Sequence, residues 1–187
     1  MRSIAAIFAA ALVLSGCQSL RDRLDGPQPN PGPCPNALSL YDAHRLVEFR
    51  GEERVLGNVG FTGEILNVVS DCAYTDDRAT PIDLQLAAQF AFGRGAAAEG
   101  SEKTYYYFVA VTRTDDVVIE REVFPITVRF EPGQDRVEVT EEISSILIPR
   151  VAPTTSGANF EVIIGFVLTP EQIEFNRSGL RFRVPVE

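Results

Sequence analysis

The stretch Ile82-Asp-Leu-Gln-Leu-Ala-Ala-Gln-Phe-Ala-Phe92 decides the fold of this chain. Every second residue from Ile82 to Phe92 is hydrophobic, whereas Asp83, Gln85 and Gln89 occupy positions between them. Successive side chains of a β-strand point to opposite faces, so this pattern is typical of a strand with one buried face.

The same period of two extends along most of the chain on both sides of this stretch. It predicts seven further strands: Ala43–Phe49, Phe61–Ala73, Tyr105–Arg113, Val117–Phe130, Arg136–Ile148, Phe160–Thr169 and Leu180–Val186. Turn-forming residues separate several of them, at Thr75–Arg78, Thr114–Asp116 and Glu131–Gln134. Pro125 is expected to break or bulge its segment, or to place it at a sheet edge, because proline cannot donate to the ladder.

Two local signals complete the fold prediction. Tyr105–Arg113 and Val117–Phe124 are expected to form a hairpin through the turn between them. Thr169-Pro170-Glu171-Gln172 is typical of a helix start, with an N-cap threonine, a first-turn proline and a glutamine that can complete a capping box. We therefore expect an all-β, antiparallel β-sandwich of seven or eight strands, immunoglobulin- or fibronectin-like, with one short C-terminal helix. The chain has no tryptophan, so the Cys…Trp…Cys hallmark of true immunoglobulin domains is absent.

The N-terminus has the features of an export signal. Arg2 is followed by an apolar run from Ile4 to Leu14, which is too short to span a bilayer, and the run ends in Leu14-Ser-Gly-Cys17. These four residues resemble the lipobox of bacterial lipoproteins. The resemblance implies cleavage before Cys17 and attachment of lipid to its thiol, which makes residues 1–16 a signal peptide. The alternative is an ordinary secretory signal with a chance cysteine.

The lipoprotein resemblance also implies a location. Residues 17–33 would form a lipidated tether, because alternating prolines between Pro27 and Pro33 favour extended backbone. In Gram-negative lipoproteins an aspartate after the lipidated cysteine favours the inner membrane. Gln18 therefore implies the inner leaflet of the outer membrane, facing the periplasm. Residues 34–187 would form the single folded domain.

The net charge and the cysteines indicate which partners and which disulfide to expect. The formal net charge is −9, so we expect no binding to nucleic acid and no electrostatic attraction to anionic lipids. In an oxidising compartment, Cys34 and Cys72 are expected to form a disulfide. Free thiols, or a metal pair with His44, are the alternatives, although zinc would require four ligands.

No strong catalytic signature occurs, and we expect no enzyme activity, cofactor or metal. His44 is the only histidine, and its position near Asp42 and Arg45 favours a surface or hydrogen-bonded role over a catalytic triad. Lys103 is expected in an exposed polar loop, where it would make a poor general base. Paired acidic residues fall mostly at predicted turns, and calcium binding there has no supporting repeat.

Two segments are candidates for binding. The glycine-rich loop Phe92–Gly100, which contains Arg94, is expected to join two strands and lacks the lysine of a phosphate-binding loop. Tyr105 and Tyr107 share one face of a strand. Exposed, they would form a contact patch for protein or glycan, and buried, they would belong to the core. The core is the favoured interpretation.

Three segments, Phe61–Ile65, Phe108–Thr112 and Gly165–Gln172, resemble small Gram-negative lipoproteins, a resemblance that implies no activity. Together these features favour a non-enzymatic protein-interaction or structural module of the cell envelope, anchored by lipid and contacting an envelope protein. The alternative is a module that binds a small ligand or a glycan.

Overall fold

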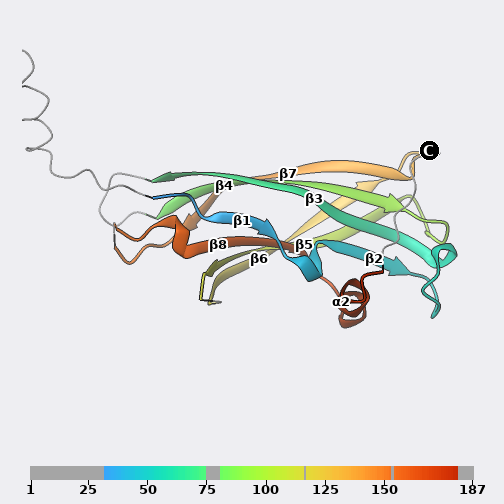
Figure 1. The fold of residues 1–187 in the computed structure, drawn as a ribbon. Helices are drawn as coiled ribbons and strands as arrows, with labels where there is room; N and C mark the ends of the chain where they lie inside the picture. The colour runs from blue at the N-terminus through green and yellow to red at the C-terminus, as the bar shows by residue number, and fades with distance from the viewer. Residues whose placement is uncertain (1–31, 75–80, 116, 153, 181–187) are drawn as a thin grey trace, which may run out of the picture. The chain divides into compact units, whose positions relative to one another are not determined.

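The computed structural model describes residues 32–74, 81–115, 117–152 and 154–180, which include two four-stranded sheets (Figure 1). Sheet A has the strand order β1-β8-β5-β6, and sheet B has the order β2-β3-β4-β7. All neighbouring strands are antiparallel except β1 and β8. The predicted all-β sandwich with one short C-terminal helix is confirmed.

The strands of sheet A are β1 (Asn36–Ser39), β5 (Glu102–Arg113), β6 (Val118–Arg129) and β8 (Phe160–Phe166). Those of sheet B are β2 (Arg45–Phe49), β3 (Val59–Tyr74), β4 (Ile82–Arg94) and β7 (Arg136–Ile148). The described residues also form the short 3-10 turns η1 (Tyr41–Ala43), η2 (Leu56–Asn58) and η3 (Gly157–Asn159), and the α-helix α2 (Pro170–Arg177).

The stretch from Ile82 to Phe92 lies in β4, between β3 and β7. Its alternate hydrophobic side chains are at most 3% exposed, as the period of two predicts. They face aromatic side chains of sheet A, and the ring centroids of Phe92 and Tyr105 lie 4.4 Å apart. Burial of these large apolar surfaces is the main force that holds the two sheets together.

The connections between the sheets follow an immunoglobulin-like Greek key. β4 pairs with β7 and β5 pairs with β8, so in each case the chain returns to a neighbour after visiting the other sheet. The B–E and C–F neighbours of immunoglobulin domains have this relationship. The free side of β8 is covered by β1, which runs parallel to it. This strand was not predicted, because its four residues carry too little alternation to be recognised.

Several predicted boundaries differ from the structure. The strand predicted from Ala43 begins at Arg45, since the preceding residues form η1, and the strand predicted to end at Thr169 ends at Phe166. Leu180 lies outside any strand, and residues 181–186 of the predicted last strand lie outside the described residues. The segment that resembles a lipobox, residues 17–31 of the predicted tether and the predicted turn at residues 75–78 also lie outside them.

The disulfide between Cys34 and Cys72 is confirmed, with 5.7 Å between the Cα atoms. It joins the segment before β1 of sheet A to β3 of sheet B. Tyr74 strengthens the same end of the sandwich, because its hydroxyl donates to the Pro33 carbonyl and accepts from the Gly157 amide, each at 2.7 Å. The start of the folded domain is therefore fixed to both sheets.

Helix α2 begins as predicted. The Thr169 hydroxyl accepts from the Gln172 amide, and the Gln172 side chain accepts from the Thr169 amide, which completes a capping box. Phe175 is 2% exposed and packs against β2. Within the described part of the chain, no helix has the length and hydrophobicity needed to span a bilayer.

Candidate functional site

Tyr105 and Tyr107 belong to the core. Each is 2% exposed, so the alternative in which they form a surface patch for protein or glycan is wrong. The residues that face solvent in this part of β5 are Tyr106, at 51% exposure, and the half-buried Phe108. Hydrophobic residues occur on both faces of this strand, and the face with Tyr105 and Tyr107 lies against sheet B.

Tyr107 contacts a carboxylate inside the sandwich. Burial of its hydroxyl, the negative charge of Glu141 and a hydrogen bond to that carboxylate together raise the pKa of Tyr107 to about 12. Burial, followed by the charge of Glu48, also raises the pKa of Tyr105. Both phenols therefore stay neutral at physiological pH, and their role in this structure is packing.

Arg94 lies at the end of β4 beside a surface hollow. Its Nε donates to the Gly100 carbonyl at 3.0 Å and closes the glycine-rich loop. Gly95 and Ala97 donate to the backbone carbonyls of Gly60 and Val59, so the loop is bonded to β3. The hollow has a volume of about 390 Å³ and is lined by Leu56, Val59, Arg94, Gly95, Ala96, Ala98 and Asp135.

His44 and Lys103, the two candidate catalytic bases in the sequence, each contact other residues. His44 shares a 2.5 Å hydrogen bond with the Tyr41 carbonyl, which fits the hydrogen-bonded role expected from the sequence. Lys103 was predicted in an exposed loop, but it is the second residue of β5, forms an ion pair with Glu48 and lies over the Phe61 ring. In the described ranges, no group of three or more His, Cys, Asp or Glu side chains is arranged to hold a metal.

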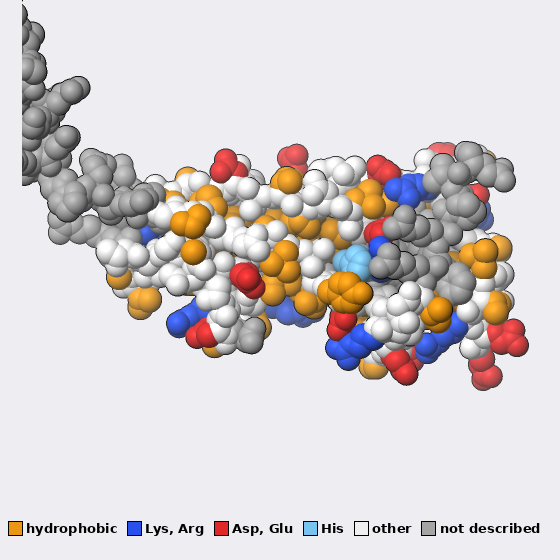
Figure 2. All heavy atoms as spheres, viewed as in Figure 1, with side chains coloured by type: hydrophobic (Ala, Val, Ile, Leu, Met, Phe, Trp, Pro, Cys, Tyr) orange, Lys and Arg blue, Asp and Glu red, His pale blue; other side chains and the backbone are white. Residues whose placement is uncertain are grey.

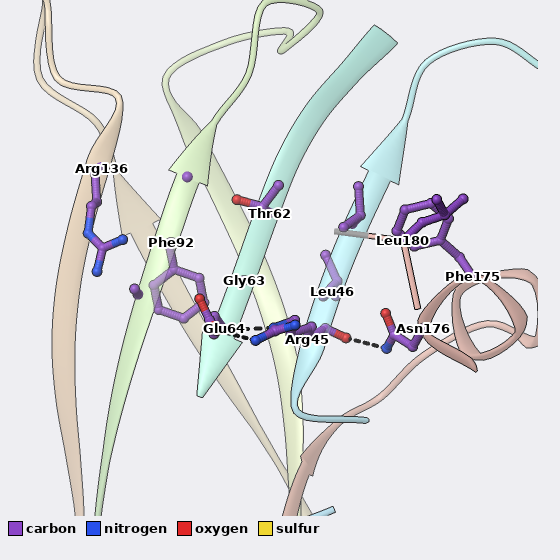
Figure 3. A pocket seen from close by; sticks show the side chains of 13 residues that line it. Arg45, Leu46, Thr62, Gly63, Glu64, Phe92, Arg136, Phe175, Asn176 and Leu180 are labelled. Atoms are coloured by element: carbon purple, nitrogen blue, oxygen red, sulfur yellow. Dashed lines mark hydrogen bonds and ion pairs between the residues drawn. The ribbon is translucent and has the colours of Figure 1, made fainter. Parts of the chain in front are cut away.

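A small pocket lies where α2 meets the outer surface of sheet B (Figure 3). Within it, Arg45 forms an ion pair with Glu64 at 2.8 Å, and Asn176 donates to the Arg45 carbonyl at 2.9 Å. The volume is about 40 Å³, which suits a few water molecules but not a ligand of drug size. These contacts fix the helix to the sheet, so the pocket is a structural junction.

The outer faces of the two sheets differ in part, because sheet B also exposes Leu66, Val69 and Leu147. On the outer face of sheet A, the exposed side chains include Tyr106, Ile119, Val123, Pro125 and Val167, the residue that follows β8. On β4 and β7 of sheet B the corresponding side chains are mostly polar, among them Asp83, Gln85, Gln89, Glu138, Thr140 and Glu142. Figure 2 shows hydrophobic side chains over β1 and β8, and acidic ones along the border where β4 and β7 lie. Exposed apolar faces of this kind mark interaction surfaces.

The most exposed part of sheet A is the first half of β6. All six residues from Val118 to Val123 are exposed, and we call this segment the β6 arm. Val118 is 58%, Ile119 37% and Val123 43% exposed. In Figure 1 the end of the β5–β6 hairpin lies well apart from β7, so neither face of the arm is covered by the other sheet.

A groove separates the arm from β7. It has a volume of about 250 Å³, and its lining comes from β5, β6 and β7: Val109, Val111, Glu120, Glu122, Phe124, Ile143, Ser145, Ile146 and Leu147. Val109 and Val111 are almost fully buried and form an apolar floor. Glu120 and Glu122 lie on the rim, on the same face of β6 as the buried Ile126 and Val128.

Among the described residues, no strand pairs with one side of the arm's backbone. β6 is the last strand of sheet A, and next to the β5–β6 register the Phe130 amide donates to the Ser101 carbonyl at 2.7 Å. Because bonded pairs alternate in an antiparallel ladder, even-numbered residues of β6 from Glu120 onward bond to β5 and odd-numbered ones face the open edge. A bulge at Ile119 ends this alternation. Pro125 is odd-numbered, so it sits at the edge, one of the positions expected from the sequence, without interrupting the ladder.

Sequence reasoning predicted the strand but not the arm. One signal was present: the inward positions of β6 change from isoleucine and valine at 126 and 128 to glutamate at 120 and 122. Carboxylates at inward positions indicate that the facing sheet has ended.

Comparisons with family models, with curated proteins and with solved structures found no match to this chain.

Proposed function

We propose that this protein is a non-enzymatic interaction module of the cell envelope that binds another protein through the β6 arm. The observation that carries the proposal is the exposure of six consecutive residues, Val118 to Val123, on both faces of an edge strand whose outer side meets no other strand in the described ranges. An exposed edge with apolar side chains is a template for a further strand, and proteins usually shield such an edge unless a partner covers it.

The proposed location follows from the lipobox resemblance. Lipid on Cys17 would anchor the chain to the inner leaflet of the outer membrane, and the proline-containing tether would hold the domain in the periplasm. Several acyl chains give stable anchoring, because each buried CH₂ contributes about 0.8 kcal/mol. The acidic character of the chain supports contact with the membrane through lipid rather than through a basic surface.

Site-specific photocrosslinking in cells tests the function. A photoreactive amino acid at Val123 reports on the arm, and the same residue at Thr140, an exposed position on the edge strand of sheet B, is the matched control. We expect one dominant envelope protein to be captured from Val123 but not from Thr140. Equal capture from both positions, or none from either, would contradict the proposal. A Cys17→Ala variant tests whether capture also depends on the anchor.

A small-ligand or glycan-binding module is the second candidate. The hollow beside Arg94 favours it, since about 390 Å³ lies within the usual range for ligand pockets and both Arg94 and Asp135 offer polar contacts. A soluble sugar or metabolite that binds saturably to the purified protein, and loses affinity in Arg94→Ala but not in Val123→Pro, would favour this candidate over the first.

A further inference from the structure

We infer that the partner of the β6 arm binds as an extended strand, with basic side chains directed at Glu120 and Glu122. This inference rests on the proposed function and specifies the binding mode and the chemistry of the partner. Three observations carry it: the open backbone edge, the charge of the groove, and the poor fit of the arm to a second copy of itself.

The backbone edge determines the binding mode. Arg121 and Val123 are the odd-numbered residues of the arm between the bulge at Ile119 and the rest of β6, and each directs an amide and a carbonyl toward the open side of sheet A. A partner strand can pair with these groups and extend the sheet by one strand. Its own side chains would then alternate between the groove and the apolar outer face.

The charge of the groove determines which side chains of the partner strand fit into it. Among the described residues that line it, Glu120 and Glu122 are the charged ones, and both are carboxylates. The nearest cation in sequence, Arg121, lies on the opposite face, where its guanidinium stacks over the Phe108 ring at 4.5 Å. Lysine or arginine suits this groove, because the charged end can meet the glutamates while the aliphatic stem covers the apolar floor.

A second copy of the chain fits poorly at this edge. A two-fold antiparallel pairing must bring odd-numbered residues opposite each other. When it is centred on Glu120, Arg121 or Glu122, a glutamate of one arm faces a glutamate of the other. Like charges in directly opposed positions destabilise a sheet, whereas opposite charges stabilise it. In these registers the arm therefore favours a basic partner strand over self-association.

Two capped peptides test the inference on the purified full-length protein. One alternates valine and lysine, VKVKVKV, and the other alternates valine and glutamate, VEVEVEV. Fluorescence anisotropy of labelled peptide measures binding. We expect the lysine peptide to bind at least tenfold more tightly than the glutamate peptide. We also expect the double variant Glu120→Lys/Glu122→Lys to reverse that preference and Arg121→Glu to keep it.

A proline variant separates strand pairing from simple charge attraction. Val123→Pro removes one open-edge amide, and Thr140→Pro makes the matched change on the edge strand of sheet B. The lysine peptide should lose at least tenfold in affinity with Val123→Pro and keep its affinity with Thr140→Pro. Equal binding of both peptides, or affinity unchanged in Val123→Pro, would overturn the inference. If capture from Val123 in cells nevertheless succeeds, the proposed function stands and only the strand mode fails.

Discussion

Pro125 lies opposite Tyr106 in the β5–β6 ladder, at a position where the backbone of β6 faces the open edge of sheet A. Proline is tolerated there because no ladder hydrogen bond requires its missing amide. From Glu120 to Val123, this relationship shows which residues of the arm bond to β5 and which are available to a partner.

Adjacent residues of the arm should therefore differ in their response to proline. Glu122→Pro removes an amide that pairs with Val109 and should lower the free energy of unfolding by about 1–3 kcal/mol. Val123→Pro removes an open-edge amide and should cost less than about 1 kcal/mol, since no buried acceptor is left unpaired. Urea denaturation of both variants checks the difference. Equal losses would show that the alternation of bonded and open positions has been assigned incorrectly.

The glycine-rich loop is held against β3 at one point where only glycine fits. A Cβ atom at Gly95 would lie 2.1 Å from the carbonyl oxygen of Val59, a backbone atom that cannot move aside easily. Gly95→Ala should lower the free energy of unfolding by about 1–3 kcal/mol, as overpacking usually does. Gly57→Ala is the matched control, because a Cβ there meets nothing within 4 Å. Thermal denaturation that gave both variants the same midpoint would contradict this account.

The Cys34–Cys72 disulfide should make a large contribution to stability. It closes a loop over a sequence separation of 38, for which chain entropy predicts about 3–4 kcal/mol. The double variant Cys34→Ser/Cys72→Ser should lose that amount in urea denaturation under oxidising conditions. Adding a reductant should lower the stability of the wild-type chain and leave the double variant unchanged. A wild-type chain that is insensitive to the reductant would show that the bridge contributes little.

Tyr107 should make the fold sensitive to alkaline pH. Its pKa in the folded protein is about 12, mainly through burial, whereas an unfolded tyrosine titrates near 10. Between these values the unfolded chain binds fewer protons than the folded one, so the free energy of unfolding falls as pH rises from 10 to 12. Below about pH 10 both states keep the proton, and Tyr107 adds no pH dependence. Urea denaturation across this window should show a shallower decline for Tyr107→Phe, and an unchanged slope would contradict the assignment.

Much of the fold is predictable from the local pattern of side chains. β4 and β7 show clear alternation, and the start of α2 has a capping box with proline in the first turn. β1 was missed because its pairing with β8 links positions more than a hundred residues apart, and four residues carry little local signal. Distant pairing of this kind leaves no periodic trace in the sequence.

The candidate site was harder to predict than the fold. Alternation places Tyr105 and Tyr107 together but does not say which face of β5 is buried, since Tyr106 and Phe108 on the other face are also aromatic. The β6 arm exists because β7 does not cover Val118 to Val123, and this depends on how the two sheets are offset. The glutamates at 120 and 122 were the sequence features that marked it.

We expect the β6 arm to be the surface that meets another protein. Photocrosslinking in cells from Val123, compared with the same photoreactive residue at Thr140, tests it most directly. We expect one dominant envelope protein to be captured from Val123, with little or none from Thr140. Capture that is equal at the two positions, or absent from both, would contradict it.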